Sequence, residues 1–440
     1  MSATPPARSG RLETWFWLLI VLALGLRLAA GVLIRARMSP GEPVTAPKTE
    51  VEYLRSPYME LGDSQQYLLL AESLTKNGAF GWGAGPVTFR LPGYPTLLAL
   101  LGNRMWLIVL VQAVFGALVV LMSGMIGRRL GGDAGGLVAA GLVAADVGSV
   151  LHVGLVMSES LFLLLLVLAV FMFLSRTNWA AGLALGAAAM TRPIALPAFV
   201  PMALVLLVRG QRRQLALFLV AFAVLPGLWL ARNWRSFGIP GFTSNGGFNT
   251  FYAAAGALVA EREGISIDSA RVQLATEHAL ELDGDNPLRV GAAMGRIGRE
   301  LIRQDFPVYI RVYCRGVAWI LFGVKADDLV SRIVRPEMRL SRARLVLRSG
   351  ELRRAARTAA VGLAAFELLL TAVILVTAVA GLGRLRRDLD AWLLLGLAVF
   401  FVLAASPLTD GRFRMPAIPL LAMLAGGAVS RRLHVLTSTA

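Results

Sequence analysis

The chain has 440 residues, of which 56% are apolar, and its mean hydropathy is +0.66. Apolar runs of membrane length occur along the whole sequence. This composition excludes the soluble classes of protein. The formal net charge of +17 would indicate nucleic-acid binding in a soluble protein, but here much of the arginine lies in short turns between apolar runs, as membrane topology requires. The runs are blocks of Leu, Ala and Val rather than alternating strands, so we expect an all-α polytopic membrane protein without a nucleic-acid partner.

The first apolar run, Trp15 to Ile34, is about twenty residues long and exceeds the usual core of a signal peptide. We expect it to be an uncleaved membrane span. The segment before it, residues 1–14, carries Arg8 and Arg11 and predicts a short cytoplasmic tail.

Ten apolar segments predict membrane spans. They are Trp15–Ile34, Met105–Ile126, Gly135–Leu151, Leu161–Leu174, Trp179–Met190, Ile194–Val208, Leu215–Leu230, Leu363–Val379, Ala391–Ala405 and Ala417–Val429. With the N-terminus inside, basic turns such as Arg128-Arg129 and Arg384 to Arg387 all fall on the cytoplasmic side.

One further apolar segment, Phe306 to Val324, carries Arg311 and Arg315 four residues apart, and therefore on one helical face. Counting it as an eleventh span would place Arg384 to Arg387 outside. We therefore expect a helix in the membrane interface, with its arginines among the lipid headgroups, and a total of 10 to 11 transmembrane helices.

This topology leaves two long outer loops. The chain then divides into an N-terminal transmembrane module over residues 15–231, with the first outer loop at 35–104, an outer region over 232–362, and C-terminal transmembrane helices over 363–440. Within the outer region, Arg332 to Arg357 holds nine arginines and two glutamates. This run favours a basic amphipathic helix on anionic membrane lipids over a specific ligand site.

Arginine precedes proline at three predicted helix starts, in Arg90-Leu-Pro92, Arg192-Pro193 and Arg414-Met-Pro416. Proline is favoured in the first helical turn, but a cation there opposes the helix dipole by several tenths of a kcal/mol. A bound phosphate would satisfy the helix N–H groups and the guanidinium together. The alternative for each arginine is an interaction with lipid phosphates at the membrane surface.

Arg192 is a particular case because the preceding segment, Trp179–Met190, spans only about twelve residues, or roughly 18 Å of helix. Arg192 would then lie below the outer surface, where an ionisable group usually faces a cavity or a partner. Gly182 and Gly186 in the same segment indicate close helix packing.

Two acids are the candidate catalytic residues. Asp63 lies in the first outer loop, and Glu159 lies at the outer mouth of the predicted fourth span. If they converge on one cavity, they could serve as a general base and as a second polar or metal contact. The alternatives are a solvated loop acid for Asp63 and a helix N-terminal acid that complements the dipole for Glu159.

The loop from Gly241 to Asn249 is rich in glycine and asparagine, with aromatic residues nearby. This composition suits a tight turn, and it also suits hydrogen bonds to a hydroxyl-rich ligand. Known nucleotide-binding, metalloprotease and serine-hydrolase motifs are absent from the sequence, and the three histidines are scattered. We therefore expect no cofactor and no metal cluster, although a divalent cation stays possible.

Seven short motifs occur in an order that resembles the membrane glycosyltransferases of the C-type fold. They are Gly62-Asp-Ser-Gln-Gln-Tyr67, Arg90-Leu-Pro-Gly-Tyr-Pro95, Ser158-Glu159, Thr191-Arg-Pro193, Leu230-Ala-Arg-Asn-Trp234, Ser244-Asn-Gly-Gly-Phe-Asn249 and Gly411-Arg-Phe-Arg-Met-Pro416. The resemblance is to bacterial relatives of the dolichyl-phosphate-mannose protein mannosyltransferases and lipid A aminoarabinose transferases, which are similar to glycosyltransferase family 39. It covers most of the chain.

The resemblance implies transfer of a sugar, with inversion, from a polyprenyl-phosphate donor to a protein, lipid or glycan acceptor. It implies a bacterial inner-membrane protein whose active site lies on the outer face. Asp63 maps onto the general base of the family. The family often has a second acid where this chain has Ser64, and we expect Glu159 to supply this missing carboxylate. The residues implied to bind substrate are Tyr67, Arg90, Tyr94, Arg192, Asn245, Asn249, Arg412 and Arg414.

Two other functions stay open on sequence alone. A flippase or transporter of lipid-linked sugars would also use outer arginines, but it would more often show paired hydrophobic halves, which the sequence lacks. A non-catalytic scaffold of the same fold is the third possibility.

Overall fold

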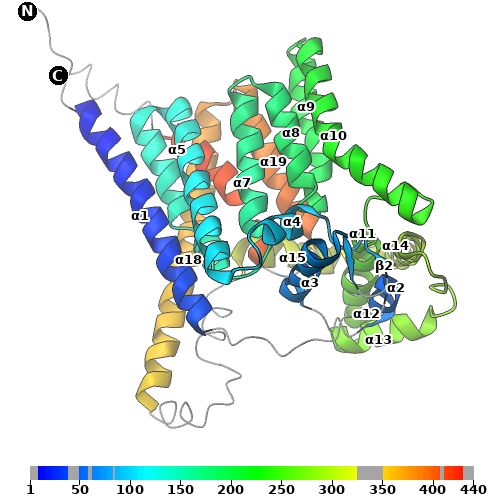
Figure 1. Cartoon of the computed structure of the whole chain (residues 1–440). Coiled ribbons are helices and arrows are strands. Elements are labelled where there is room, and N and C mark those ends of the chain that lie inside the picture. Colours follow the sequence, from blue (N-terminus) through cyan, green and yellow to red (C-terminus); the bar gives the residue numbers. More distant parts are fainter. Residues whose placement is uncertain are drawn as a thin grey trace, which may run out of the picture.

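The computed structural model describes residues 8–37, 49–57, 62–82, 85–324, 350–406 and 411–429. Figure 1 shows a bundle of long helices with a cluster of short helices at one end. Of the predicted basic helix over Arg332–Arg357, the part up to residue 349 lies outside the described residues, and the remainder begins helix α18 (Gly350–Arg384).

Every predicted apolar segment lies largely within helices of the bundle. These are α1 (Arg8–Arg37), α5 (Met105–Ala144), α7 (Glu159–Leu174), α8 (Asn178–Ala189), the 3-10 turn η1 (Pro193–Ala198) with α9 (Phe199–Val208), α10 (Arg212–Phe237), α18, α19 (Leu389–Ala405) and α20 (Ala417–Gly427). Within the described residues, four helices are long and apolar enough to cross a membrane, in α1, α5, α10 and α18, and four apolar segments are shorter. The protein is thus a multi-pass membrane protein, and the number of crossings stays a prediction.

Helix α5 covers the predicted span Met105–Ile126 and the first part of the predicted span Gly135–Leu151. Between them, Gly131 and Gly132 interrupt the helical geometry, Gly132 with φ +69. The prediction of one continuous helix over Gly135–Leu151 was wrong. The helix stops at Ala144, and the separate α6 (Val147–His152) begins with Asp146 as its cap, whose carboxylate accepts a hydrogen bond from the Ser149 amide at 2.8 Å. A polar cap inside an apolar run was mistaken for part of the span.

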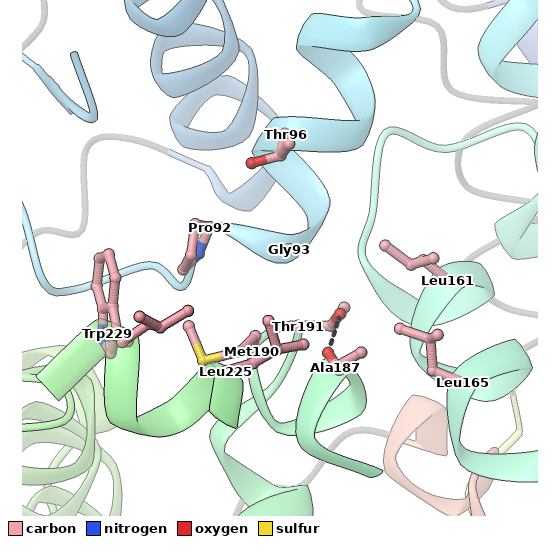
Figure 2. Close-up of a pocket in the computed structure, with 11 residues that line it drawn as sticks. Pro92, Gly93, Thr96, Leu161, Leu165, Ala187, Met190, Thr191, Leu225 and Trp229 are labelled. Atoms are coloured by element: carbon pink, nitrogen blue, oxygen red, sulfur yellow. Dashed lines mark hydrogen bonds between the residues drawn. The ribbon is translucent and has the colours of Figure 1, made fainter. Parts of the chain in front are cut away.

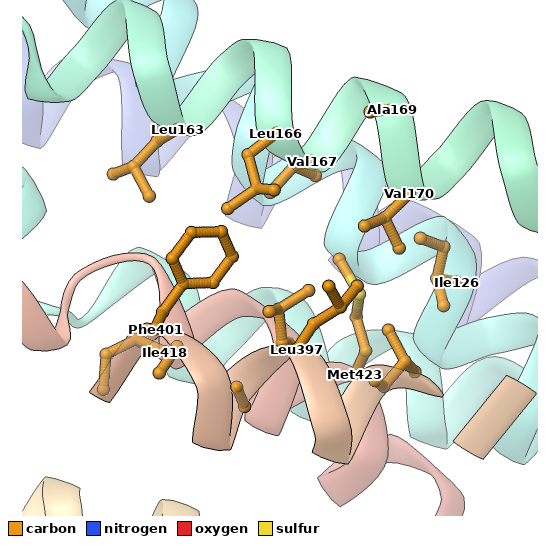
Figure 3. Close-up of a cluster of buried hydrophobic side chains, with 14 of the residues drawn as sticks. Ile126, Leu163, Leu166, Val167, Ala169, Val170, Leu397, Phe401, Ile418 and Met423 are labelled. Atoms are coloured by element: carbon orange, nitrogen blue, oxygen red, sulfur yellow. The ribbon is translucent and has the colours of Figure 1, made fainter. Parts of the chain in front are cut away.

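The core of the bundle is centred on α7. Figure 3 shows Leu166 and Val170 of α7 facing Phe401 of α19 and Met423 of α20, and all four are fully buried. Since lipid is as apolar as these side chains, close van der Waals contact rather than the hydrophobic effect holds such helices together. The predicted close packing at Gly182 is present: a Cβ there would lie 2.2 Å from the Phe218 carbonyl oxygen of α10.

A second core joins the short helices at one end of the bundle. We call this the loop unit: α2 (Glu50–Arg55), the antiparallel strands β1 (Gly81–Trp82) and β2 (Gly85–Pro86), α11 (Asn245–Phe248), the π-helix η2 (Asn249–Ala255), α12 (Gly256–Glu263), α13 (Ile267–Glu277) and α14 (Pro287–Gln304). Tyr53 stacks on Phe248, and Phe89 packs edge-to-face against both, with ring centroids 4.9 to 5.8 Å apart. In the Gly241–Asn249 segment, Asn245–Phe248 form the short helix α11, and residues 241–244 are not helical.

Helices α3 (Asp63–Asn77) and α4 (Gly93–Leu100) connect the loop unit to the bundle. Leu70 of α3 packs in the core of the loop unit, whereas Tyr67, one turn earlier, packs against Tyr94 of α4 with ring centroids 5.0 Å apart. The N-terminus of α3 is thereby fixed between the two parts of the molecule.

Helix α15 (Phe306–Phe322) corresponds to the apolar segment that carries two arginines. Its Tyr313 hydroxyl donates to the Leu403 carbonyl at the end of α19 at 2.8 Å, and its Arg315 pairs with Glu261 of α12 at 2.9 Å. It is not among the apolar helices of the described residues that qualify as candidate spans. These contacts are at one end of the bundle, and its place in the membrane interface stays a prediction.

Candidate active site

A cavity of about 900 Å³ lies between the end of the bundle and the loop unit. The ends of bundle helices contribute Thr191, Arg192, Ala405 and Arg412. The loop unit contributes Tyr53, Phe248, Arg271 and Arg299. Helix α3 contributes Asp63 and Tyr67, and the segment before α4 contributes Arg90. Segments far apart in the sequence therefore share one cavity.

Asp63 is the first residue of α3, where a carboxylate complements the helix dipole. It forms a close ion pair with Arg90 and a second one with Arg412 Nη1 at 3.2 Å. The guanidinium of Arg90 holds the pKa of Asp63 well below its usual range, and Arg412 and Arg192 add to this effect while burial opposes it. Asp63 is therefore ionised at neutral pH.

Arg90 is held in place from several directions. Its Nε donates to Gln66 Oε1 at 2.7 Å, and its guanidinium carbon lies 5.2 Å from the centroid of the Tyr67 ring. The Gln66 amide in turn donates to the Tyr53 hydroxyl at 2.9 Å. This network orients Arg90 toward Asp63 and leaves little freedom for either side chain.

Glu159 begins α7 and lies behind the cavity wall, with 4% of its side chain exposed. Its Oε1 is 2.6 Å from Arg192 Nη1 and 3.8 Å from Arg412 Nη1. Arg412 is therefore the link between the two predicted acids, since it contacts both Asp63 and Glu159. The two carboxylates converge as expected, but through a shared guanidinium.

The side chains alternate in charge from Arg90 through Asp63, Arg412 and Glu159 to Arg192. We call this set the inner cluster. Three guanidinium groups and two carboxylates leave it with a single positive charge. A cluster of this kind is suited to a monoanion that contacts two of its cavity-lining arginines, Arg192 and Arg412.

The structure brings seven of the ten predicted site residues to the cavity. They are Asp63, Tyr67, Arg90, Arg192, Asn245, Asn249 and Arg412. Glu159 reaches the site only through the two arginines. Tyr94 is fully buried between helices, with its hydroxyl donating to Gln112 Oε1 at 3.0 Å, so it supports Tyr67 rather than lining the cavity.

Arg414 does not reach the cavity either. It is 3% exposed, pairs closely with Glu367 of α18 and donates to the Gly323 carbonyl at 2.7 Å. The short helix η3 (Gly411–Arg414) carries Arg412 and Arg414 two residues apart, so they point to different places. The ion pair of Arg414 anchors the turn that presents Arg412.

Sequence reasoning missed Arg271 and Arg299, which line the loop-unit side of the cavity. No local signal distinguishes them from the other arginines of this polar region. Arg299 is exposed on the same helix as Arg289 and Arg296, which do not line the cavity. Only the three-dimensional packing of α14 on α11 separates these positions.

A buried acid, Glu50, was also missed. It is 4% exposed and accepts hydrogen bonds from the Thr88 amide and hydroxyl and from the Ser244 hydroxyl. Burial raises the pKa of Glu50, and these hydrogen bonds oppose the rise. Because Thr88 precedes Arg90 by two residues and Ser244 precedes Asn245, Glu50 connects two walls of the cavity.

A second pocket, of about 430 Å³, is apolar and adjoins the cavity (Figure 2). It is lined by Pro92, Gly93, Thr96, Leu161, Leu165, Ala187, Met190, Thr191, Leu225, Leu228 and Trp229. Thr191 lines both spaces, immediately before Arg192. An apolar space thus begins where the charged wall ends.

The described residues contain no group of three or more His, Cys, Asp or Glu side chains that could hold a metal ion. The candidate site is therefore built from arginines, two carboxylates, amides and aromatic rings.

No protein-family model and no curated protein matches the chain. Among solved structures, the archaeal oligosaccharyltransferase AglB from Archaeoglobus fulgidus, in complex with an inhibitory peptide and a dolichol-phosphate, matches 97% of this chain with a TM-score of 0.50 and 15% identity. The chain spans 52% of the length of that protein. ArnT from Cupriavidus metallidurans, bound to undecaprenyl phosphate, matches 95% of this chain, which covers 78% of it, with a TM-score of 0.39 and 15% identity.

At this identity the likeness to AglB establishes the fold alone. The chain has the C-type fold of membrane glycosyltransferases, and that part of the prediction is confirmed. What the two proteins bind is a property of those proteins, and the activity of this chain has to be argued from its own site.

Proposed function

We propose that the protein is a glycosyltransferase that moves a sugar from a polyprenyl-phosphate donor to an acceptor hydroxyl. The observation that carries this proposal is the placement of Asp63 beside Arg412 in a cavity that adjoins an apolar pocket. A polyprenyl-phosphate sugar has three matching parts: an apolar chain, a phosphodiester with one negative charge, and a polar sugar.

Each part of the donor has a counterpart in the structure. The first isoprene units enter the apolar pocket beside Thr191, and the phosphate contacts Arg192 and Arg412, where its charge neutralises the inner cluster. The sugar extends into the cavity toward Asn245 and Asn249, whose amides donate to and accept from hydroxyl groups.

In the reaction, Asp63 takes the proton of the acceptor hydroxyl while that oxygen forms a bond to the anomeric carbon. The bond from this carbon to the phosphate oxygen breaks, and polyprenyl phosphate leaves with the electron pair. A single displacement inverts the anomeric centre. Arg192 and Arg412 stabilise the charge that develops on the leaving phosphate, the kind of term that usually contributes most to catalysis.

The low pKa of Asp63 bears on this role, because a carboxylate paired with two guanidinium groups is a weak base. When the donor phosphate shares Arg412, Asp63 keeps only Arg90 as a close partner, and its basicity rises. Donor binding thus raises the basicity of the carboxylate that deprotonates the acceptor hydroxyl.

We further propose that the cavity faces the non-cytoplasmic side of a bacterial inner membrane, with α15 in the interface. The distribution of basic turns supports this orientation, since Arg209 follows the end of α9, whereas the η1 turn at the start of the same segment lines the cavity.

The test is sugar transfer by membranes that contain the parent chain, given a panel of radiolabelled polyprenyl-phosphate sugars. We expect Asp63→Asn to lower the rate about 10²- to 10⁴-fold, the usual contribution of a general base. Asp133→Asn is the matched control, because Asp133 is also about 30% exposed and paired with an arginine but lies away from the cavity. Equal rates for the parent and Asp63→Asn would refute Asp63 as the base, and no transfer by the parent with any donor would favour a flippase or scaffold.

A further inference from the structure

The cavity carries more positive charge than the proposed donor needs. Among the described residues, its lining includes five arginines, at positions 90, 192, 271, 299 and 412, and a single acid, Asp63. The donor phosphate accounts for the inner cluster. Arg271 and Arg299 lie apart from that cluster, on α13 and α14 of the loop unit.

These two arginines have little local compensation. Arg271 pairs with Asp268 at 3.1 Å, but 81% of the Asp268 side chain is exposed, so solvent screens this pair. Arg299 has no hydrogen bond or ion pair with any described residue. Its Nη1 would lie 3.1 Å from a Cβ added at Gly295, which places the guanidinium over the contact between α14 and α11.

Resting on the function proposed above, we propose that Arg271 and Arg299 bind a phosphate group on the acceptor, so that the acceptor is an anionic, phosphate-bearing molecule. With a neutral acceptor, Arg271 would keep only the exposed Asp268 as a counter-charge, and Arg299 would have none among the described residues. A phosphate satisfies them by charge-assisted hydrogen bonds and holds a nearby hydroxyl group between the loop unit and Asp63. The phosphate can belong to a lipid headgroup or to a soluble phosphorylated sugar or glycan.

The first measurement asks whether the product is charged. Membranes with the parent chain transfer label from the active donor, and the labelled product is extracted and applied to an anion-exchange column at neutral pH. We expect the product to bind the column, and partition into organic solvent then distinguishes a lipid acceptor from a soluble one. A labelled product that passes through the column uncharged overturns the inference but leaves the proposed transferase intact.

The second measurement assigns the charge recognition to the two arginines. We expect Arg271→Gln/Arg299→Gln to lower the transfer rate at limiting acceptor at least tenfold. Arg289→Gln/Arg296→Gln, two exposed arginines of α14 outside the cavity, should stay within twofold of the parent. The single variant Arg299→Gln guards against misfolding, because Arg299 supports no other described side chain, and we expect it to lower the rate at least threefold.

A third measurement does not depend on turnover. Calorimetric titration of glycerol 3-phosphate is carried out on the purified protein in micelles saturated with undecaprenyl phosphate. We expect the double variant at positions 271 and 299 to bind at least fivefold more weakly than the parent and the control pair. If binding follows this pattern but no donor supports transfer, the phosphate site stands and the proposed enzyme fails. Equal binding by all variants refutes the site.

Discussion

At the scale of single residues, the site is defined by arginines that share acids. Arg412 contacts both Asp63 and Glu159, whereas Arg90 and Arg192 each hold one of them. A substitution at any of these positions therefore changes the charge state of its neighbours. Lysine would not restore an arginine here, because a single ammonium group cannot bridge two carboxylates with the fixed geometry of a guanidinium.

The depressed pKa of Asp63 predicts how activity depends on pH. A carboxylate whose pKa is lowered in the native state stays ionised at every pH above the usual carboxylate pKa of about 3.9. Its contribution to stability is lost only as the pH falls through the lower native pKa. We therefore expect kcat/KM at saturating donor to vary less than threefold between pH 8 and pH 5. A midpoint within that window that moves in Asp63→Glu would show that Asp63 titrates there. Thermal unfolding of the parent over the same range tests the stability claim, which predicts no loss from this residue.

The buried pair of Arg414 and Glu367 predicts a stability effect rather than a direct effect on chemistry. Removing one partner of a buried ion pair costs about 3 to 5 kcal/mol, because the remaining charge stays buried after it has lost this counter-charge. We expect Arg414→Met to lower the unfolding temperature in detergent strongly. We expect Arg414→Met/Glu367→Met to recover most of the loss.

A misplaced η3 turn would also move Arg412, so donor affinity in Arg414→Met should fall together with stability. The outcome that contradicts this account is a single variant as stable as the parent but without donor binding. That result would mean that Arg414 contacts the donor itself.

At the scale of elements, close helix contacts set where the site residues stand. Helix α8 is only 12 residues long and ends three residues before Arg192, so its packing against α10 determines the depth of this arginine. A Cβ at Gly182 would lie 2.2 Å from a backbone carbonyl of α10. The two helices would have to separate to accept any side chain.

We expect Gly182→Ala to destabilise the protein by about 1 to 3 kcal/mol, the usual cost of overpacking, although alanine favours helix more than glycine does. The measurement is thermal unfolding in detergent beside Gly396→Ala in α19, where a Cβ meets nothing within 4 Å. The control should be as stable as the parent or more so. A Gly182→Ala protein at least as stable as the parent would show that α8 and α10 are not in this close contact.

At the scale of the whole molecule, the sequence was sufficient for what depends on local pattern. Apolar runs predicted the four described helices that are long and apolar enough to cross a membrane. The arginine–proline pairs correctly predicted the helix starts after positions 90, 192 and 414. The order of short motifs predicted a fold that is shared with AglB at only 15% identity. Apolar periodicity and prolines at helix starts act within a few residues, which explains why they can be read directly.

The sequence was insufficient where long-range packing decides. Arg412 and Arg414 stand two residues apart, yet one lines the cavity and the other is buried against α18. Arg271 and Arg299 line the cavity only because of the way α13 and α14 pack in the loop unit. Neighbouring residues of the same type can thus have different roles, and only the contacts with distant segments separate them.

The size of the apolar pocket has a consequence for donor selection. Its volume of about 430 Å³ admits only a few isoprene units, and it adjoins the charged wall at Thr191. The protein would therefore contact only the isoprene units nearest the phosphate, and the remainder of the lipid chain would stay in the bilayer. The protein would then discriminate between lipid donors by the saturation and double-bond geometry of their first isoprene units. Donors of very different chain length would be used equally well.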